Sequence, residues 1–150
     1  RAMGCGQEVI DSINFAGPLH DIGKIGVRDE ILLKKSGFTG EEREIMKSHV
    51  VRGEEILRPL NLLACERAVV LYHHERWDGG GYPKGLCGQD IPVVARIFSV
   101  ADTFDAMTST RPYRQALSLD VAKEEIIKCR GSQFDPAVVD AFITSEILKG

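Results

Sequence analysis

The apolar residues of this sequence recur with helical spacing along almost its whole length. Between Thr39 and Leu57, for example, Ile45, Met46 and Val50 fall on one side of a helix. No segment alternates apolar and polar residues with the period of two that a half-buried strand shows. The sequence therefore predicts an all-α domain, and it contains no internal repeat.

Capping residues mark where the expected helices begin. Thr39 and Glu42 form a T-x-x-E capping box. We expect Asp90 to cap a helix with Pro92 in its first turn, and Asp135-Pro136 repeats this order. The expected helices cover residues 8–16, 39–57, 62–74, 91–107 and 118–131, and a last one starts at 135.

The bulk properties are those of one folded domain and exclude several classes of protein. The chain has 150 residues, of which 43% are hydrophobic and 27% charged, enough for a single core. Its net charge of −3 gives no general attraction to a nucleic acid polymer or an anionic membrane. No apolar run approaches the roughly 20 residues of a membrane helix, so we expect no membrane insertion.

The cysteines indicate a reducing compartment. The chain has four, with no CxxC pair, which disfavours a zinc knuckle and a disulfide framework. We therefore expect free thiols and a cytoplasmic location. Because the first residue is Arg1 rather than methionine, we also expect the chain to be a fragment of a longer protein.

His20 and Asp21 stand together in the sequence PLHDIGKIG. Adjacent helical side chains point about 100° apart, yet an imidazole and a carboxylate can converge on one metal ion, or on two that the carboxylate bridges. Lys24 lies three residues after Asp21 on the same helical face, where its ammonium group can meet a phosphate oxygen. An ordinary Asp–Lys surface pair has the same spacing.

His49 lies on the side of its expected helix that carries Met46 and Gly53. A histidine on such a face is usually a hydrogen-bonded core residue, which is the alternative to a metal ligand. Glycine inside a helix costs roughly 1 kcal/mol relative to alanine. We therefore expect another part of the chain to approach the helix closely at Gly53.

His73 and His74 end the third expected helix and precede the sequence ERWDGGGYP. Neutral imidazole is the commonest transition-metal ligand, although a helix C-terminus also favours protonated histidine. The glycines let backbone and aromatic rings approach a ligand, and we expect Tyr82 to stack on a base while Pro83 stiffens the turn. The alternative is a flexible linker, which the flanking aromatic residues disfavour.

Two further motifs carry charge beside apolar sequence. Asp102 lies in the helix VARIFSVADTFDAMTS, where an unpaired buried carboxylate needs a cation, hydrogen bonds or a proton. Asp105 is a second candidate there, and a hydrogen-bonded structural aspartate is the alternative. Arg111 and Arg114 follow in RPYR, where the spacing suits bidentate contacts to phosphate or belongs to an ordinary basic loop.

Together these motifs hold all four histidines of the chain. A set of imidazoles and carboxylate oxygens suits iron, manganese or zinc better than magnesium or calcium. The ordered motifs HDIGKIG, H-x-x-x-G from His49 to Gly53, HHERWDGGGYP, VADTFDAMTSTRPYR and GSQFDPAVVDAF resemble the HD-GYP domain, a subgroup of the HD phosphohydrolase superfamily. The resemblance runs from about Leu19 to Phe142.

The resemblance implies a fold, cofactors and a domain organisation. It implies an all-α HD-domain helical bundle that binds two or three divalent transition-metal ions, with iron or manganese favoured. Residues 1–150 would form one HD-GYP domain that lacks the upstream helices and any sensory or receiver domain. Active members hydrolyse the bacterial second messenger cyclic di-GMP to pGpG or GMP, and some cleave related cyclic dinucleotides. A hydroxide that bridges two metals would attack the phosphorus.

The resemblance also implies a role for each motif residue. The metal ligands would be His20, Asp21, His49, His73, His74 and Asp102. Catalysis would involve Asp21 and Lys24. The substrate would contact Lys24, Gly81, Tyr82, Pro83, Arg111 and Arg114.

Two features depart from the family pattern and keep other functions open. Members with three metals take a glutamate and a histidine from an upstream helix, and no histidine precedes His20 here. Gly17-Pro18 interrupts a helix that the family usually continues. The leading hypothesis is a cyclic di-GMP phosphodiesterase. The runner-up is a non-catalytic module that binds the dinucleotide or a diguanylate cyclase domain, and a third is a phosphohydrolase acting on mononucleotides.

Overall fold

The prediction of an all-α fold is confirmed. The computed structural model describes residues 3–110 and 115–145, and within these ranges it has no strand, only an isolated bridge between Arg130 and Phe134. In chain order the α-helices are α1 (Gln7–Ala16), α2 (Asp29–Leu32), α3 (Gly40–Lys47), α4 (His49–Leu57), α5 (Ala64–Tyr72), α6 (Val93–Thr108), α7 (Leu119–Lys128) and α8 (Pro136–Ile143). Short 3-10 helices cover Gly17–Leu19, Ile22–Gly26, Arg58–Leu60 and Gly88–Asp90.

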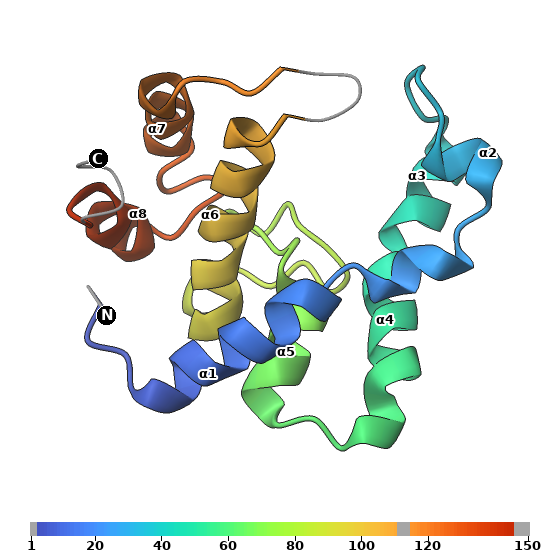
Figure 1. Ribbon diagram of the computed structural model, residues 1–150, viewed down its shortest axis with the longest axis horizontal. Helices are drawn as coiled ribbons and strands as arrows, with labels where there is room; N and C mark the ends of the chain where they lie inside the picture. The colour runs from blue at the N-terminus through green and yellow to red at the C-terminus, as the bar shows by residue number, and fades with distance from the viewer. Residues whose placement is uncertain (1–2, 111–114, 146–150) are drawn as a thin grey trace.

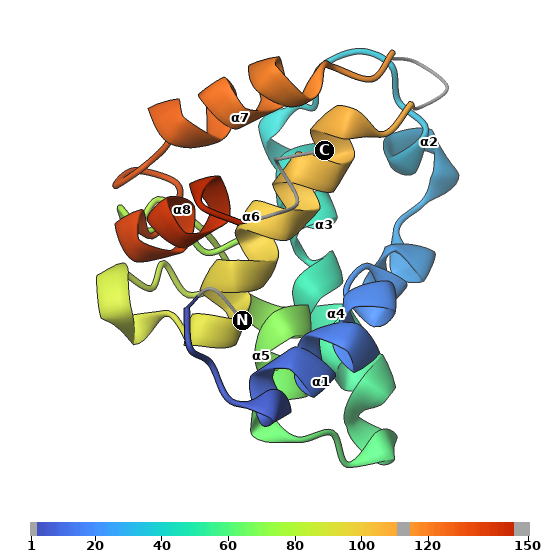
Figure 2. The ribbon, with the colours of Figure 1, turned by 60° about the vertical axis from the view of Figure 1, so that its left-hand side comes forward.

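The long helix α6 runs through the middle of the molecule. The pair α7 and α8 packs against one side of it, while α3 and α4 lie on the other side (Figures 1 and 2). Helix α5 contacts both α4 and α6, and α1 crosses against α5 and α6. This arrangement places the end of α5, the middle of α6 and the start of α4 around one region.

Two apolar clusters form the core, and α6 contributes to both. The first lies among α1, α4, α5 and α6 and contains Ala16, Leu57, Ala68, Val69, Val70, Val94 and Phe98. The second lies among α6, α7 and α8 and contains Val100, Ile126, Phe134, Val138 and Val139. Because α6 is shared, it fixes the two halves of the domain relative to each other.

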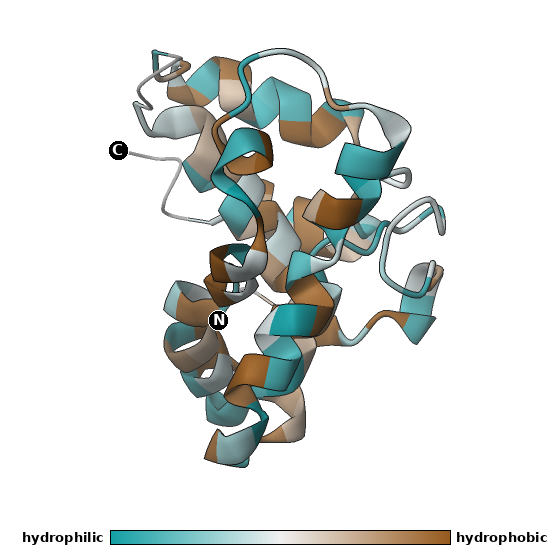
Figure 3. Cartoon of the chain, turned by 90° about the vertical axis from the view of Figure 1, so that its right-hand side faces the viewer, coloured by the Kyte–Doolittle hydropathy of each residue, from teal (hydrophilic) through white to brown (hydrophobic). Residues whose placement is uncertain are grey.

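The outer face formed by α2, α3 and α4 mixes hydrophilic and hydrophobic residues (Figure 3). This is the pattern of amphipathic helices that pack one side onto a core. Within residues 3–110 and 115–145, no helix is both long enough and apolar enough to cross a bilayer.

The prediction of a single helix for residues 39–57 is wrong, because the segment divides at Ser48 into α3 and α4. The Ser48 hydroxyl donates to the carbonyl of Ile45 (2.6 Å), and the His49 ring bonds to that of Met46 (2.7 Å). Side-chain bonds of this kind compete with the helical ladder. The predicted capping box between Thr39 and Glu42 is confirmed.

Of three other predicted helix starts, the cap at Asp90 is wrong and those at Ser118 and Asp135 are confirmed. Asp90 does not cap α6: it ends a 3-10 helix, and Pro92 occupies the N-cap position. Helix α7 begins after Ser118 as expected, with the hydroxyl accepting from the backbone of Val121. Asp135 caps α8 by accepting from the backbone of Ala137.

The predicted interruption at Gly17-Pro18 is confirmed, but His20 and Asp21 do not have the α-helical geometry that was assumed for their side chains. They occupy the turn between the 3-10 helices Gly17–Leu19 and Ile22–Gly26. Pro18, which has no backbone N–H, lies in the first of these 3-10 helices. The short helix α2, which the sequence did not predict, follows the second.

Candidate metal centre

Two glycines let the 3-10 helix Ile22–Gly26 cross α4 in close contact. A Cβ atom added to Gly23 would lie 1.9 Å from the carbonyl oxygen of His49 and 2.5 Å from the nitrogen of Gly53, so no side chain fits there. A Cβ atom on Gly53 would lie 3.4 Å from the nitrogen of Gly23. The predicted close approach at Gly53 is therefore confirmed, and it brings Asp21 beside His49.

The crossing and the end of α5 gather the predicted ligands into one cluster. Asp21, His49, His73 and His74 each offer a donor atom, and these atoms all lie within 4.8 Å of one another. His20 joins them, since its Nε2 lies 3.3 Å from Asp21 Oδ2 and 3.6 Å from an oxygen of Asp102 on α6. All six predicted ligands thus lie in one region.

Backbone carbonyls orient three of the imidazole rings. Nδ1 of His20 lies 2.5 Å from the carbonyl oxygen of Gly17. Nδ1 of His49 lies 2.7 Å from the carbonyl oxygen of Met46. Nδ1 of His73 lies 3.0 Å from the carbonyl oxygen of Val69. A carbonyl can only accept, so each Nδ1 carries the hydrogen, and a neutral ring then turns the Nε2 lone pair inward. Metal-binding histidines are commonly oriented in this way.

Two of these inward nitrogens are buried and have no hydrogen-bond partner among the described residues. They are Nε2 of His49 and of His73, whose residues are 1% and 2% exposed. Leaving a buried polar atom unpaired costs roughly 1–3 kcal/mol. The Asp21 carboxylate lies 3.3 Å from Nε2 of His49, so a lone pair faces a negative charge. A cation between them removes both costs, and the cluster therefore fits a metal ion.

The ionisation states also fit. Burial, with a smaller effect of His74, lowers the pKa of His73 to about 2. Burial, with a smaller effect of His49, lowers the pKa of His74 to about 4. Burial alone would raise the pKa of Asp21, but hydrogen bonds with His20 and Lys24 hold it well below its ordinary value. For His73 and His74 this gives the neutral imidazoles that metal binding requires. Burial would also lower the pKa of His20, but its hydrogen bonds with Asp21 and Gly17 raise it above its ordinary value, so a metal ion there would displace a proton.

Lys24 lies where the sequence placed it, beside Asp21. In a 3-10 helix residues three apart lie directly above one another, and the Lys24 ammonium group donates to Oδ2 of Asp21. Asp105, by contrast, is exposed, and an oxygen of its side chain accepts from the hydroxyl of Ser109. The suggestion that Asp105 joins or supports the cluster is wrong.

The loop after His74 is well defined, which excludes a flexible linker. The buried carboxylate of Glu75 accepts from the backbone of Lys84 (2.7 Å) and of Leu86 (2.9 Å). A Cβ atom on Gly81 would lie 2.4 Å from the nitrogen of Arg76. The glycine therefore lets the returning loop lie against the residues that follow His74. The role of Glu75 was not predicted, because its partners are backbone N–H groups of Lys84 and Leu86, and the local sequence does not show that these groups return to Glu75.

Tyr82 lies against the cluster and is joined to Pro83 by a cis peptide bond. The Tyr82 ring stacks on that of His74 with centroids 4.8 Å apart and planes 22° apart. This contact covers one face of a candidate ligand, and the expectation that Tyr82 stacks on a base stays a prediction.

A cavity of about 450 Å³ opens beside the cluster. Its lining includes His73, His74 and Asp102, and its other walls come from α3, from the loop after His74 and from Gln133. Arg43 and Lys47 of α3 also line it, and the sequence did not single them out. Arg111 and Arg114, predicted to contact phosphate, lie outside the described residues.

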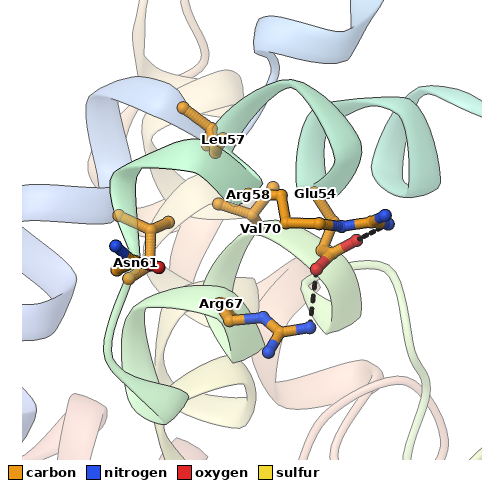
Figure 4. A pocket seen from close by; sticks show the side chains of 7 residues that line it. Glu54, Leu57, Arg58, Asn61, Arg67 and Val70 are labelled. Carbon is orange, nitrogen blue, oxygen red and sulfur yellow. Dashed lines mark hydrogen bonds and ion pairs between the residues drawn. The ribbon is translucent and has the colours of Figure 1, made fainter.

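A second cavity, of about 330 Å³, lies near the other end of α4 and has a different character. Glu54 projects into it between Arg58 and Arg67 (Figure 4). One carboxylate oxygen accepts from Arg67 (2.6 Å) and the other from Arg58 (3.1 Å). Every oxygen of this buried side chain is therefore paired within the protein.

The comparisons with known proteins all point to HD-domain phosphodiesterases. The model of a family described as "HD domain" matches residues 2–138. A cyclic di-GMP phosphodiesterase from Thermotoga maritima is 48% identical over 146 residues, covering 96% of this chain and 40% of that protein. The cyclic di-GMP phosphodiesterase response regulator RpfG of Xanthomonas campestris pv. campestris is 43% identical over 143 residues, covering 94% and 38%.

A solved structure agrees with these sequence relatives. A cyclic GMP-AMP specific phosphodiesterase from V. cholerae superposes with a TM-score of 0.71 at 19% identity, covering 97% of this chain and 41% of that one. At this identity the likeness shows the fold. The chain spans about two fifths of the length of the curated relatives reported above.

Proposed function

Because the chain belongs to the HD-GYP subgroup of the HD domain family, we propose that its cluster binds divalent metal ions and hydrolyses cyclic di-GMP. The observation that carries the proposal is the pair of buried, unpartnered Nε2 atoms of His49 and His73 beside the Asp21 carboxylate. The printed names of the sequence relatives support the substrate. The name of the structural relative makes a cyclic GMP-AMP dinucleotide the nearest alternative.

The six clustered residues supply donors for two ions, held by His20, Asp21, His49, His73, His74 and Asp102. Imidazole nitrogens mixed with carboxylate oxygens favour iron or manganese. When bound, such ions polarise phosphoryl oxygens and lower the pKa of a water molecule. A third ion would need ligands from beyond these six residues.

The protein's own groups prepare the site for phosphodiester cleavage. Asp21 keeps its negative charge and holds the Lys24 ammonium group beside the cluster. That ammonium can stabilise the charge that develops on a phosphoryl oxygen during attack. Tyr82 stacks on His74 and so limits the movement of that ring. Gly81 and Pro83 act in substrate binding by holding this wall of the cavity in place.

The organisation of the whole protein is also part of the proposal. We take residues 1–150 as one HD-GYP domain attached to a sensory or receiver domain, which the response-regulator name of the Xanthomonas relative supports. The four cysteines form no disulfide, which supports a cytoplasmic location.

The test is hydrolysis of cyclic di-GMP by the chain loaded anaerobically with Fe²⁺ or Mn²⁺, with products separated by chromatography. We expect linear pGpG or GMP from the wild type and no product from Asp21→Ala. Asp105→Ala, an exposed aspartate outside the cluster, is the matched control and should retain the wild-type rate. Full activity in Asp21→Ala would exclude the proposed role, and faster turnover of cyclic GMP-AMP would change the proposed substrate.

A further inference from the structure

The cavity beside the cluster has cations on its walls that the ligand set does not use. Arg43 and Lys47 come from α3, and Arg76 comes from the loop after His74. Arg43 and Lys47 are four residues apart in one helix, so their side chains lie on the same face. A cavity with a metal-binding cluster at one side and cations at another suits a ligand that carries more than one negative charge.

Two of these cations already have partners in the protein. The Arg76 guanidinium donates to both oxygens of Asp78, at 3.0 and 2.7 Å, and to the amide oxygen of Gln133 at 3.3 Å. Lys47 donates to an oxygen of Glu44 at 2.7 Å. These contacts neutralise the charges that Arg76 and Lys47 would otherwise offer to a ligand.

Arg43 differs from both. Within residues 3–110 and 115–145, its guanidinium makes no hydrogen bond, ion pair or ring contact. Its five N–H donors are therefore available in the fixed fork that matches a phosphate group. Among the described cations that line this cavity, Arg43 is the one whose charge is not matched inside the protein.

The helix that carries Arg43 is held firmly. Its N-terminus is closed by the capping box of Thr39 and Glu42. The Glu42 carboxylate also accepts from Lys34 at 2.7 and 2.6 Å, which ties α3 to the segment after α2. At its other end α3 leads through Ser48 into His49 of the cluster. The distance between Arg43 and the cluster is thus set by a short and rigid path.

A cyclic dinucleotide carries two phosphodiester groups, and the cluster can act on only one of them at a time. We infer that Arg43 binds the second phosphodiester, the one that is not being cleaved, an inference that rests on the proposed function. Arg43 would then distinguish a cyclic dinucleotide from a substrate with a single phosphodiester. It is a binding residue and takes no part in the bond-breaking step.

The test compares two substrates on the Mn²⁺-loaded chain: cyclic di-GMP, and bis(p-nitrophenyl) phosphate, which has one phosphodiester. We expect Arg43→Gln to raise the KM for cyclic di-GMP by roughly tenfold to a hundredfold, the usual effect of losing a charge-assisted bidentate contact. The kcat for cyclic di-GMP and the hydrolysis of the small substrate should change less than about twofold.

Two variants serve as controls. Arg28→Gln removes the same charge from an exposed position that does not line the cavity, and it should leave both substrates unaffected. Arg43→Lys keeps the charge but loses the fork, so its KM should fall between those of the wild type and Arg43→Gln.

The outcomes separate this inference from the proposed function. If the wild type cleaves cyclic di-GMP and Arg43→Gln has the same KM, the inference is wrong and the proposed function stands. If Arg43→Gln loses activity equally on both substrates, Arg43 acts through the fold or the metal centre, which also overturns the inference. If the wild type cleaves neither substrate, the proposed function fails and the inference fails with it.

Discussion

The two ends of α4 each bury a polar side chain, and they treat it in opposite ways. His49, at the start, is 1% exposed, and its inward Nε2 has no hydrogen-bond partner in the part of the chain that the structure describes. Glu54, five residues later, is 9% exposed, and both of its oxygens accept from arginines. One helix therefore carries a buried polar group without a described hydrogen-bond partner at one end and a fully hydrogen-bonded one at the other.

This difference separates a binding site from a structural contact. A buried polar group that serves the fold is normally satisfied by the protein itself, as Glu54 is. A group that is oriented by its own hydrogen bond and has no other partner among the described residues, as is the case for His49 and His73, is available to a ligand from outside the chain. Burial and polarity alone would not have distinguished Glu54 from His49 as a candidate site residue.

The largest expected effect comes from removing an unsatisfied histidine. We expect His49→Ala to lower the turnover of cyclic di-GMP by more than about a hundredfold, since even outer-shell partners of a metal ligand are worth tenfold to a hundredfold. Glu54→Gln should change the rate less than about threefold, because Glu54 is absent from the cluster and from the cavity beside it. Circular dichroism on both variants checks that the helices persist. Equal losses in the two variants would remove the distinction between the two ends of α4.

The second effect is stabilisation by metal. At a free Mn²⁺ concentration one hundred times the dissociation constant, the unfolding free energy should rise by about 2.7 kcal/mol. The wild type and Glu54→Gln should gain it equally, and His49→Ala should gain much less. Urea unfolding with and without Mn²⁺ measures this, and a gain in His49→Ala as large as in the wild type would speak against metal binding by this residue.

The third effect concerns stability without metal. Glu54→Ala should lower the unfolding free energy of the metal-free chain by about 1–2 kcal/mol, because the carboxylate is buried while Arg58 and Arg67 are largely exposed. Glu125→Ala is the matched control. This half-exposed glutamate forms an i, i+3 ion pair with the exposed Lys128, and its loss should cost less than about 0.5 kcal/mol. A cost for Glu125→Ala that matched the cost for Glu54→Ala would show that the Glu54 pair is merely a surface pair.

The smallest effect is a dependence on pH. Hydrogen bonding by Arg58, and then by Arg67, holds the pKa of Glu54 below its ordinary value of 4.5 despite burial. The folded state therefore binds the proton more weakly than the unfolded state, so the stabilisation is complete above about pH 4.5 and is lost as the pH falls through the folded pKa. The difference in unfolding free energy between the metal-free wild type and Glu54→Gln should shrink on acidification. A constant difference from pH 7 to pH 3 would contradict this sign.

Much of the fold was predictable because the signals are local. The T-x-x-E box at Thr39, the serine before α7 and the Asp-Pro pair before α8 each act on backbone groups within a few residues. The division at Ser48 was not predictable, since the apolar spacing continues across it and only side-chain bonds to preceding carbonyls reveal it.

The motifs predicted which residues come together as candidate ligands, but they did not predict how these residues are arranged. Nothing in the sequence around Asp21 shows that a turn between two 3-10 helices, and not a continuous helix, presents it to His49. The contact depends on two glycines thirty residues apart, Gly23 and Gly53, whose backbones meet only in the folded chain. Arg43 was missed for the same reason, because a single arginine on a polar helix face carries no sign of the cavity that it lines.

The most direct test of the central claim is the metal content of the chain. The wild type and Asp21→Asn are loaded anaerobically with Fe²⁺ or Mn²⁺, freed of unbound ions by gel filtration and subjected to elemental analysis. The account predicts about two ions per wild-type chain, the number for which the six clustered residues offer donors, and a clear loss in Asp21→Asn. A wild-type chain that retains no metal, or a variant that retains as much as the wild type, would contradict it.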